Sequence, residues 1–173
     1  MSAAPLRVAI IGSASSGKTT LAAALAERYR AIWVPEYLRE FVDTVQRVPV
    51  EEDQIHIAQT QVEREQAAIV RGGNFIFCDT TPLMTAVYSR HYFGGIRPDL
   101  EALLQSRHYD LTLVCAADLP WVPDGLHRES EDVSAIINRL LDEELEARRV
   151  QYTRVSGPLD QRLEQVAKVL GKE

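Results

Sequence analysis

The residues from 12 to 19 match the phosphate-loop pattern G-x-x-x-x-G-K-[ST] in full. Glycines let a backbone fold tightly around a phosphate so that its N–H groups point inward, and a following helix adds its positive end. Lys18 can reach the β- and γ-phosphates, and the Thr19 hydroxyl can ligate Mg²⁺. By average residue usage, fewer than about one in a hundred chains of this length would show the pattern by chance. The predicted phosphate-binding residues are Gly12, Ser13, Ala14, Ser15, Ser16, Gly17, Lys18, Thr19 and Thr20.

A second candidate is the carboxylate that follows an apolar run. Residues 75–78 read Phe-Ile-Phe-Cys, and Asp79 comes next, in the form of a Walker B strand. In a phosphate-loop fold this end of the strand faces the metal, so Asp79 can hold Mg²⁺ directly or through water. The simpler alternative is that Asp79 begins the turn before a helix at Pro82.

A third candidate group follows the apolar run 31–34. Ligands of open α/β sheets bind outside the carboxyl ends of the strands, so Glu36 is expected to line the crevice. A carboxylate there can accept the proton of an attacking hydroxyl or hold a ribose diol. Arg39 lies one helical turn further and can reach the same ligand. The alternative is a surface ion pair between these two residues.

The long segment after residue 115 reads as a loop. Residues 118–130 contain two prolines, a glycine and a tryptophan without periodicity, which is typical of a lid. Arg128 can then neutralise charge on a transferred phosphate, as lid arginines do in small-molecule kinases. A plain structural loop is the alternative. The polar and aromatic residues of 80–93 can contact a base-like ring, or can be ordinary helix surface and core.

The composition bounds the class of protein. The chain has 173 residues, 46% of them apolar, a net charge of −6, and two cysteines, Cys78 and Cys115. This length fits a single domain, 1–173, that can bury a core without disulfides. The acidic balance argues against a nucleic-acid or membrane partner, and the few cysteines argue against a secreted disulfide scaffold. No apolar run is long enough to cross a membrane, so we expect a cytoplasmic protein.

Alternating apolar runs and amphipathic stretches predict the elements that position these residues. The expected strands are 6–11, 31–34, 75–78, 111–115 and, more weakly, 150–155. The expected helices are 18–30, 38–45, 51–71, one that starts at Pro82, 133–145 and 159–170. Strands that alternate with helices of this length predict an α/β fold of three layers, in which helices cover both faces of a five-stranded parallel sheet.

Several of these segments together resemble the ribosylnicotinamide kinase domain of NadR-type NAD biosynthesis proteins, within the P-loop NTPase superfamily. The resemblance runs from about Arg7 to Leu170, with the same order and spacing of motifs. Its segments are Gly12 to Thr19, Glu36-Tyr37-x-Arg39, Phe77-Cys78-Asp79-Thr80, Tyr109-Asp110-Leu111 and Pro120-Trp121-Val122-Pro123-Asp124-Gly125-Leu126.

The resemblance implies an ATP-dependent kinase with a nucleoside-kinase-like fold, which phosphorylates the 5′-hydroxyl of nicotinamide riboside. It also implies Asp79 near Mg²⁺ and the transferred phosphate, beside Lys18, Thr19 and Arg128, which the phosphate-loop and lid patterns already predict there. The residues that it places around the small-molecule substrate are Glu36, Tyr37, Arg39, Gln61, Trp121 and Asp124.

The chain departs from the family pattern at three points. Ala14 stands where the family usually has glutamate, and His127 precedes Arg128 where the lid commonly reads Asp-Gly-Leu-Arg. The multifunctional members also carry DNA-binding and adenylyltransferase parts, which we do not expect within 173 residues.

Two other functions are compatible with the sequence. A deoxynucleoside or other small-molecule kinase also places a glutamate after its second strand, although Asp79-Thr80 replaces the Glu-Arg pair usual there. The second alternative is a nucleotide-dependent switch or ATPase, which binds ATP at the phosphate loop without a phosphate acceptor. The choice between ATP and GTP, the adenine contacts and the oligomeric state are left open by the sequence.

Overall fold

The computed structural model describes residues 3–123 and 130–171 of the chain. The elements, in chain order, are β1 (Leu6–Ile11), α1 (Lys18–Arg28), β2 (Ile32–Val34), α2 (Tyr37–Val45), α3 (Glu51–Arg71), β3 (Phe75–Asp79), α4 (Pro82–Phe93), α5 (Pro98–Gln105), β4 (Leu111–Cys115), α6 (Glu131–Ala147), β5 (Thr153–Val155) and α7 (Leu159–Leu170).

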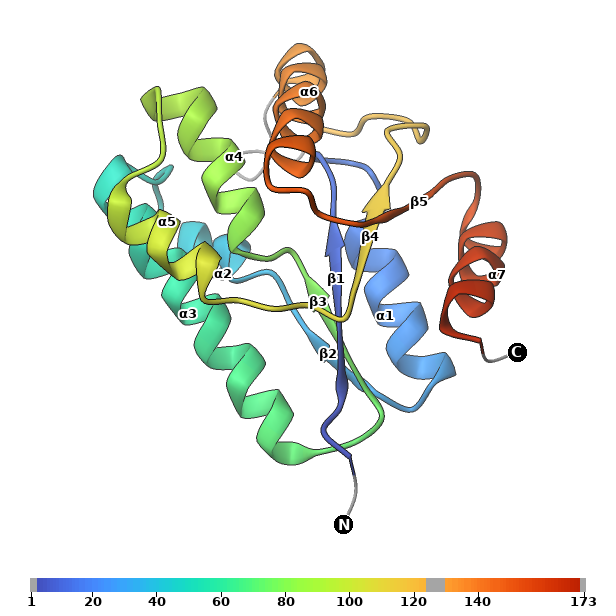
Figure 1. Ribbon diagram of the computed structural model, residues 1–173. Coiled ribbons are helices and arrows are strands. Elements are labelled where there is room, and N and C mark those ends of the chain that lie inside the picture. Colours follow the sequence, from blue (N-terminus) through green and yellow to red (C-terminus); the bar gives the residue numbers. More distant parts are fainter. Residues whose placement is uncertain (1–2, 124–129, 172–173) are drawn as a thin grey trace.

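The five strands form one parallel sheet in the order β2-β3-β1-β4-β5. The chain therefore starts at the centre of the sheet, moves to one edge, and crosses back to the other. Each crossover contains at least one helix, as is usual for parallel strands. Because all pairs are parallel, the carboxyl ends of the strands lie along one edge of the sheet; the arrows of β1 and β4 point toward the top of Figure 1. The predicted α/β fold with a five-stranded parallel sheet is confirmed.

Helices cover both faces of the sheet, which confirms the three layers. Helices α1 and α7 pack on one face, where Leu21, Leu25 and Val166 meet alternate residues of β1, β3 and β4. Helices α4 and α6 pack on the opposite face, as does α3 beside β2 and β3 (Figure 1). Because both faces are covered, Val8, Ile10 and Ile11 of β1 are all fully buried.

The helix and strand bounds differ from the predicted ones at a few positions. Helix α1 ends at Arg28, two residues early, because Arg30 adopts a left-handed backbone with φ 50°. Helix α2 begins one residue early, at Tyr37, and β5 covers only the last three residues of the predicted 150–155. Helix α5 was not predicted, because eight residues span too few turns for a clear periodicity.

A cluster of buried polar side chains joins α3 to the segment before β4. The Tyr109 hydroxyl donates to both carboxylate oxygens of Glu65, at 2.8 and 3.0 Å, and Arg107 pairs with the same carboxylate at 3.0 Å. Burial raises the pKa of the Glu65 carboxyl, and these two partners oppose the rise. The cluster ties the middle of α3 to the segment before β4, which fixes the helix that carries Gln54 and Gln61.

Both cysteines are free, buried and on central strands. Burial raises the pKa of the Cys115 thiol to about 11, and it raises the pKa of Cys78 well above its usual range. Because the thiolate is the reactive form, we expect neither thiol to react with Ellman's reagent at pH 8 in the native protein. The same assay in denaturant, the control, should count two thiols per chain, the number in the sequence. Rapid reaction of the native protein would contradict this burial.

Candidate active site at the carboxyl ends of the strands

The phosphate loop connects β1 to α1 and wraps the amino end of that helix. Gly17 has φ 87°, and a Cβ atom there would lie 2.9 Å from Leu119 Cδ1 and 3.2 Å from an Arg162 nitrogen. The left-handed backbone therefore favours glycine, and any Cβ atom would have to displace the ends of the Leu119 and Arg162 side chains. The first turn of α1 has no acidic residue and no side-chain cap. Its N–H groups are thus available to an anion, as at helix amino ends that bind phosphate.

The cationic side chain of the loop is already directed inward. Lys18 is 6% exposed, and its ammonium group donates to the carbonyl oxygen of Ser13 at 2.8 Å. This contact curls the side chain over the loop. A phosphate in the loop can therefore meet the ammonium group and the helix amino end together.

The Walker B carboxylate meets the end of the phosphate loop. The Thr19 hydroxyl donates to Asp79 Oδ2 at 2.7 Å, although 60 residues separate them in sequence. Asp79 ends β3 and is 1% exposed. A hydroxyl and a carboxylate oxygen at this distance are the hard oxygen ligands that Mg²⁺ prefers, so the residues present fit a divalent cation.

A cavity of about 240 Å³ lies over the loop. Its walls are residues 15–20 of the loop and of α1, Glu36, and three residues of the segment after β4, Leu119, Pro120 and Val122. The Val122 N–H donates to Ser15 Oγ at 3.0 Å, so this segment lies directly against the loop. Two predicted lid residues, Asp124 and Arg128, lie outside the described residues. Trp121 is half-buried in the described part of the segment.

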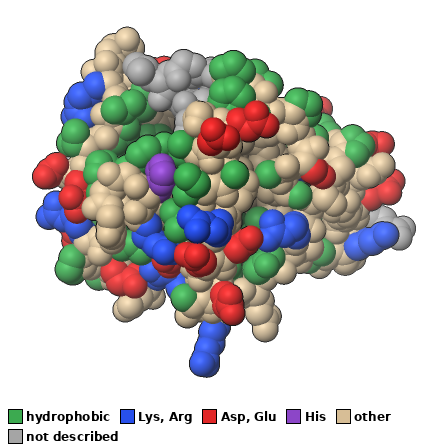
Figure 2. Space-filling model, turned by 90° about the horizontal axis from the view of Figure 1, so that it is seen from above, with side chains coloured by type: hydrophobic (Ala, Val, Ile, Leu, Met, Phe, Trp, Pro, Cys, Tyr) green, Lys and Arg blue, Asp and Glu red, His purple; other side chains and the backbone are tan. Residues whose placement is uncertain are grey.

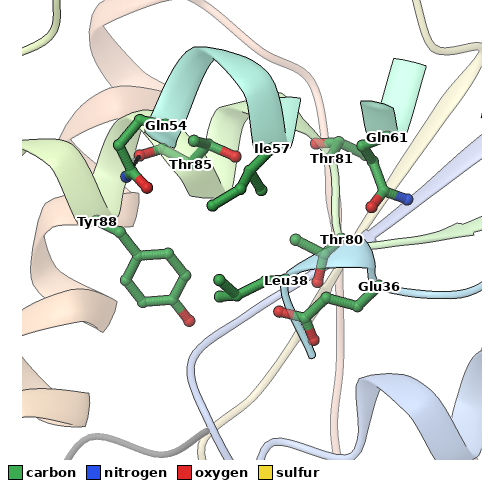
Figure 3. Close-up of a pocket in the computed structure, with 9 residues that line it drawn as sticks. All are labelled: Glu36, Leu38, Gln54, Ile57, Gln61, Thr80, Thr81, Thr85 and Tyr88. Carbon is green, nitrogen blue, oxygen red and sulfur yellow. Dashed lines mark hydrogen bonds between the residues drawn. The ribbon is translucent and has the colours of Figure 1, made fainter. Parts of the chain in front are cut away.

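Glu36 also lines a second, smaller cavity of about 20 Å³ (Figure 3). The other residues around it come from α2, from α3, from the two residues between β3 and α4, and from α4 itself. They are Leu38, Gln54, Ile57, Gln61, Thr80, Thr81, Thr85 and Tyr88. Glu36 therefore stands between the phosphate-loop cavity and a mixed polar and apolar cavity.

The turn that carries Glu36 is held by Gln61 of α3. The Gln61 side chain accepts from the Tyr37 N–H at 2.8 Å and donates to the Pro35 carbonyl at 3.2 Å. Both groups of one amide thus bracket Glu36, whose carboxylate does not cap its own helix. Gln61 is 4% exposed and orients this turn.

The remaining predicted substrate residues lie close by on α2. The Tyr37 ring packs against Phe41 and His56, and its hydroxyl lies 3.3 Å from the His56 ring. Arg39 is half-buried on the same helix. Among the described residues, neither Tyr37 nor Arg39 belongs to the walls of the two cavities. Their contact with a substrate stays a prediction.

An arginine that sequence analysis missed braces the phosphate loop from α7. Arg162 is 1% exposed and donates to the carbonyl oxygens of Ser16, Gly157 and Ala116 and to the Asp118 carboxylate. The Gly157 N–H donates to the same carboxylate at 2.7 Å, which is the main cause of the lowered pKa of Asp118. A signal was present in the sequence, because Arg162 lies within the apolar stripe of its helix, one turn before Val166.

Replacing Arg162 by methionine should lower the free energy of unfolding by about 3 kcal/mol and the melting temperature by about 6–12 °C. The variant loses four hydrogen bonds and leaves buried carbonyl oxygens without a donor. Urea titration measures the change. The matched control is Arg154→Met, whose exposed pair with Asp142 should contribute less than about 1 kcal/mol. Equal stability of the two variants would mean that Arg162 does not brace the loop.

Charge is mixed on the face that surrounds the site. Figure 2 looks onto the carboxyl ends of the strands, and in its described part basic and acidic side chains alternate without gathering into one large basic surface. No helix in the described part of the chain combines the length and apolar character needed to cross a membrane.

Comparison with known proteins agrees with this geometry. A model of an AAA domain family matches residues 7–162. The chain belongs to this family. The match includes the phosphate loop, Glu36, Asp79 and Arg162, and therefore every described residue around the two cavities.

The AAA-domain chain is also similar to a curated bacterial protein. It is 30% identical, over 155 residues, to the trifunctional NAD biosynthesis/regulator protein NadR of Escherichia coli (strain K12). The match covers 86% of this chain and 37% of that protein. The predicted resemblance to NadR-type proteins is therefore confirmed, over little more than a third of the relative's length.

Solved structures share the fold of the AAA-domain chain. A NadR protein in complex with NR has a TM-score of 0.83 at 21% identity, over 98% of this chain and 52% of that one. A NadR protein in complex with NAD and AMP-PNP has a TM-score of 0.79 at 22% identity, over 98% and 50%. Deoxyadenosine kinase from M. mycoides has a TM-score of 0.69 at 14% identity, over 96% and 99%. The predicted kinase-like phosphate-loop fold is confirmed.

Proposed function

We propose that the chain is an ATP-dependent kinase that transfers a phosphoryl group to the 5′-hydroxyl of nicotinamide riboside, giving nicotinamide mononucleotide. The observation that carries the proposal is the position of Glu36, which lines both the phosphate-loop cavity and the cavity beside it. A transferase needs a donor site and an acceptor site that meet at one reactive group, whereas an acceptor-free ATPase does not.

The donor site is the phosphate loop. Its N–H groups, the amino end of α1 and Lys18 hold the β- and γ-phosphates of ATP. Thr19 and Asp79 would hold Mg²⁺, which supplies charge neutralisation at the transferred phosphate when bound. ATP as the donor is supported by the similar fold of a NadR protein bound to AMP-PNP.

The acceptor site is the smaller cavity. Nicotinamide riboside is supported by the relationship to NadR and by the similar fold of a NadR protein bound to NR. In the reaction, the acceptor oxygen forms a bond to the γ-phosphorus, the bond from that phosphorus to the β,γ-bridging oxygen breaks, and Glu36 accepts the hydroxyl proton. Proton removal comes late, because phosphoryl transfer depends more on positioning than on a strong base.

The acceptor cavity is narrow in this conformation. Its volume of about 20 Å³ has room for one water molecule, far below the roughly 300 Å³ of a usual ligand pocket. Binding must therefore move its walls, which come from α2, α3 and α4. The walls must move apart, so the cavity widens when the acceptor enters.

Incubation of the pure protein with Mg-ATP and nicotinamide riboside should give nicotinamide mononucleotide, detected by chromatography. A Lys18→Met protein serves as the blank, and formation no faster than this blank would refute the proposal. Deoxyadenosine and other nucleosides belong in the same assay, since a deoxyadenosine kinase shares the fold. Faster phosphorylation of one of them would assign the chain to nucleoside kinases instead.

A further inference from the structure

Thr80, which directly follows the Walker B carboxylate, has an unusual backbone conformation. Its φ is 68°, in the left-handed region that β-branched residues rarely adopt. The conformation is held by a hydrogen bond from the Thr80 N–H to the Ile10 carbonyl, 2.9 Å long, which joins the end of β3 to β1. Strained backbone of this kind persists where the surrounding structure enforces it, and it clusters at functional sites.

The Thr80 side chain is buried without a hydrogen bond of its own. The residue is 7% exposed, and its Oγ1 has no hydrogen-bond partner among the described residues. A buried hydroxyl in this state destabilises a folded protein, and nearly all such groups find a partner. The fold thus holds a strained residue whose side chain forms no polar contact with the described chain, which points to a partner that binds from outside.

The direction of the side chain identifies that partner. Thr80 lines the same cavity as Glu36, and Figure 3 shows its hydroxyl directed toward the side of the cavity where Glu36 lies. The preceding residue, Asp79, reaches the phosphate loop through Thr19. The hydroxyl therefore lies where an acceptor would present its reacting group to the transferred phosphate.

We propose that Thr80 binds the acceptor by donating a hydrogen bond from Oγ1 to the attacking hydroxyl; this inference rests on the proposed kinase function. The acceptor hydroxyl then donates its proton to Glu36 and accepts a hydrogen bond from Thr80. Its remaining lone pair is directed at the γ-phosphorus. The Thr80 proton stays on Thr80, so the residue fixes the orientation of the acceptor hydroxyl.

The test compares two variants of Thr80. Thr80→Val replaces the hydroxyl by a methyl group at nearly constant shape and keeps the β-branch. It should lower kcat/KM for the acceptor about 10- to 100-fold and leave KM for ATP unchanged. Thr80→Ser keeps the hydroxyl and should stay within about threefold of the wild type. The matched control is Thr112→Val, which is also 7% exposed but lies on β4, outside the acceptor cavity.

Thermal unfolding separates this role from a structural one. Because Thr80→Val removes a buried hydroxyl without a partner, its melting temperature should equal or exceed that of the wild type. The rise in melting temperature that the acceptor causes in the presence of AMP-PNP should be smaller in Thr80→Val than in the wild type. A lower melting temperature without ligand, or an unchanged kcat/KM, would overturn the role of Thr80.

The same measurements distinguish failure of the kinase proposal. If the wild type binds the acceptor in the thermal assay but does not phosphorylate it, the proposed kinase function fails. In that case, weaker acceptor binding by Thr80→Val than by the wild type still shows whether the hydroxyl contacts the acceptor. If the wild type neither binds nor phosphorylates any nucleoside tested, both proposals are overturned.

Discussion

Replacing Glu36 by glutamine should lower kcat for phosphoryl transfer about 100- to 1,000-fold and leave the affinity for ATP within about twofold of the wild type. The substitution keeps the shape and removes only the ability to accept a proton. Glu36 lies at the amino end of α2, between the two cavities, and Gln61 fixes the backbone on both sides of it. The fold of the variant should therefore be unchanged.

Steady-state kinetics with varied acceptor and varied ATP, together with calorimetric binding of AMP-PNP, measure the two effects. The matched control is Glu40→Gln on the same helix, an exposed carboxylate that pairs with Arg64 at 2.6 Å. This variant should have wild-type kinetics, because Glu40 is not in the wall of either cavity. Equal losses of turnover and ATP affinity in Glu36→Gln would remove Glu36 from the acceptor site.

Replacing Lys18 by methionine should lower both the affinity for ATP and the turnover, whereas Glu36→Gln should lower the turnover alone. We expect a loss of ATP affinity of at least about tenfold and a loss of turnover of about 1,000-fold. The ammonium group of Lys18 is buried over the loop, where it interacts with phosphate more strongly than it would in water. The variant keeps the aliphatic length of the side chain and loses only the charge and the hydrogen bond to Ser13.

Binding of AMP-PNP and turnover at saturating ATP report the two losses separately. Lys168→Met, an exposed lysine on α7, is the control for removal of one positive charge and should behave like the wild type. Wild-type ATP affinity in Lys18→Met would mean that the loop binds phosphate through its N–H groups alone. Comparing the two variants tests the assignment of the two sides directly. Glu36 belongs to the acceptor side, whereas Lys18 belongs to the donor side.

The local sequence was sufficient to predict the phosphate loop and most of the helices and strands. The spacing of Gly12, Gly17, Lys18 and Thr19 is a requirement of the backbone around a phosphate, so the motif predicts its own geometry. The uninterrupted stretch from Glu51 to Arg71 predicted α3 with the bounds observed, because helix formation depends on nearby residues and ends at Gly72. Apolar runs predicted the central strands for the same reason.

Other features depended on contacts between distant segments. The apolar stripe of α7 indicates that Arg162 is buried, but it does not indicate that the side chain reaches Ser16, 146 positions away, and stabilises the phosphate loop. The hydrogen bonds of Gln61 on either side of Glu36 join α3 to the start of α2. The hydrogen bond between Thr19 and Asp79 forms because β1 and β3 are neighbours in the sheet. Sequence analysis placed Gln61 at the substrate through a family resemblance, which stays a prediction; the structure adds that Gln61 lines the smaller cavity and that its amide holds the backbone of the α2 turn.

The sequence by itself thus determined the chemistry available to this protein, a phosphate loop, a Walker B carboxylate and a carboxylate after the second strand. The tertiary structure alone decided how they meet, with Glu36 between two cavities and Thr80 strained and buried beside it. The physical reason is the range of the interactions. Turn geometry and helix propensity act over a few residues, whereas burial, hydrogen-bond partners and left-handed backbone after β3 are set by packing across the sheet.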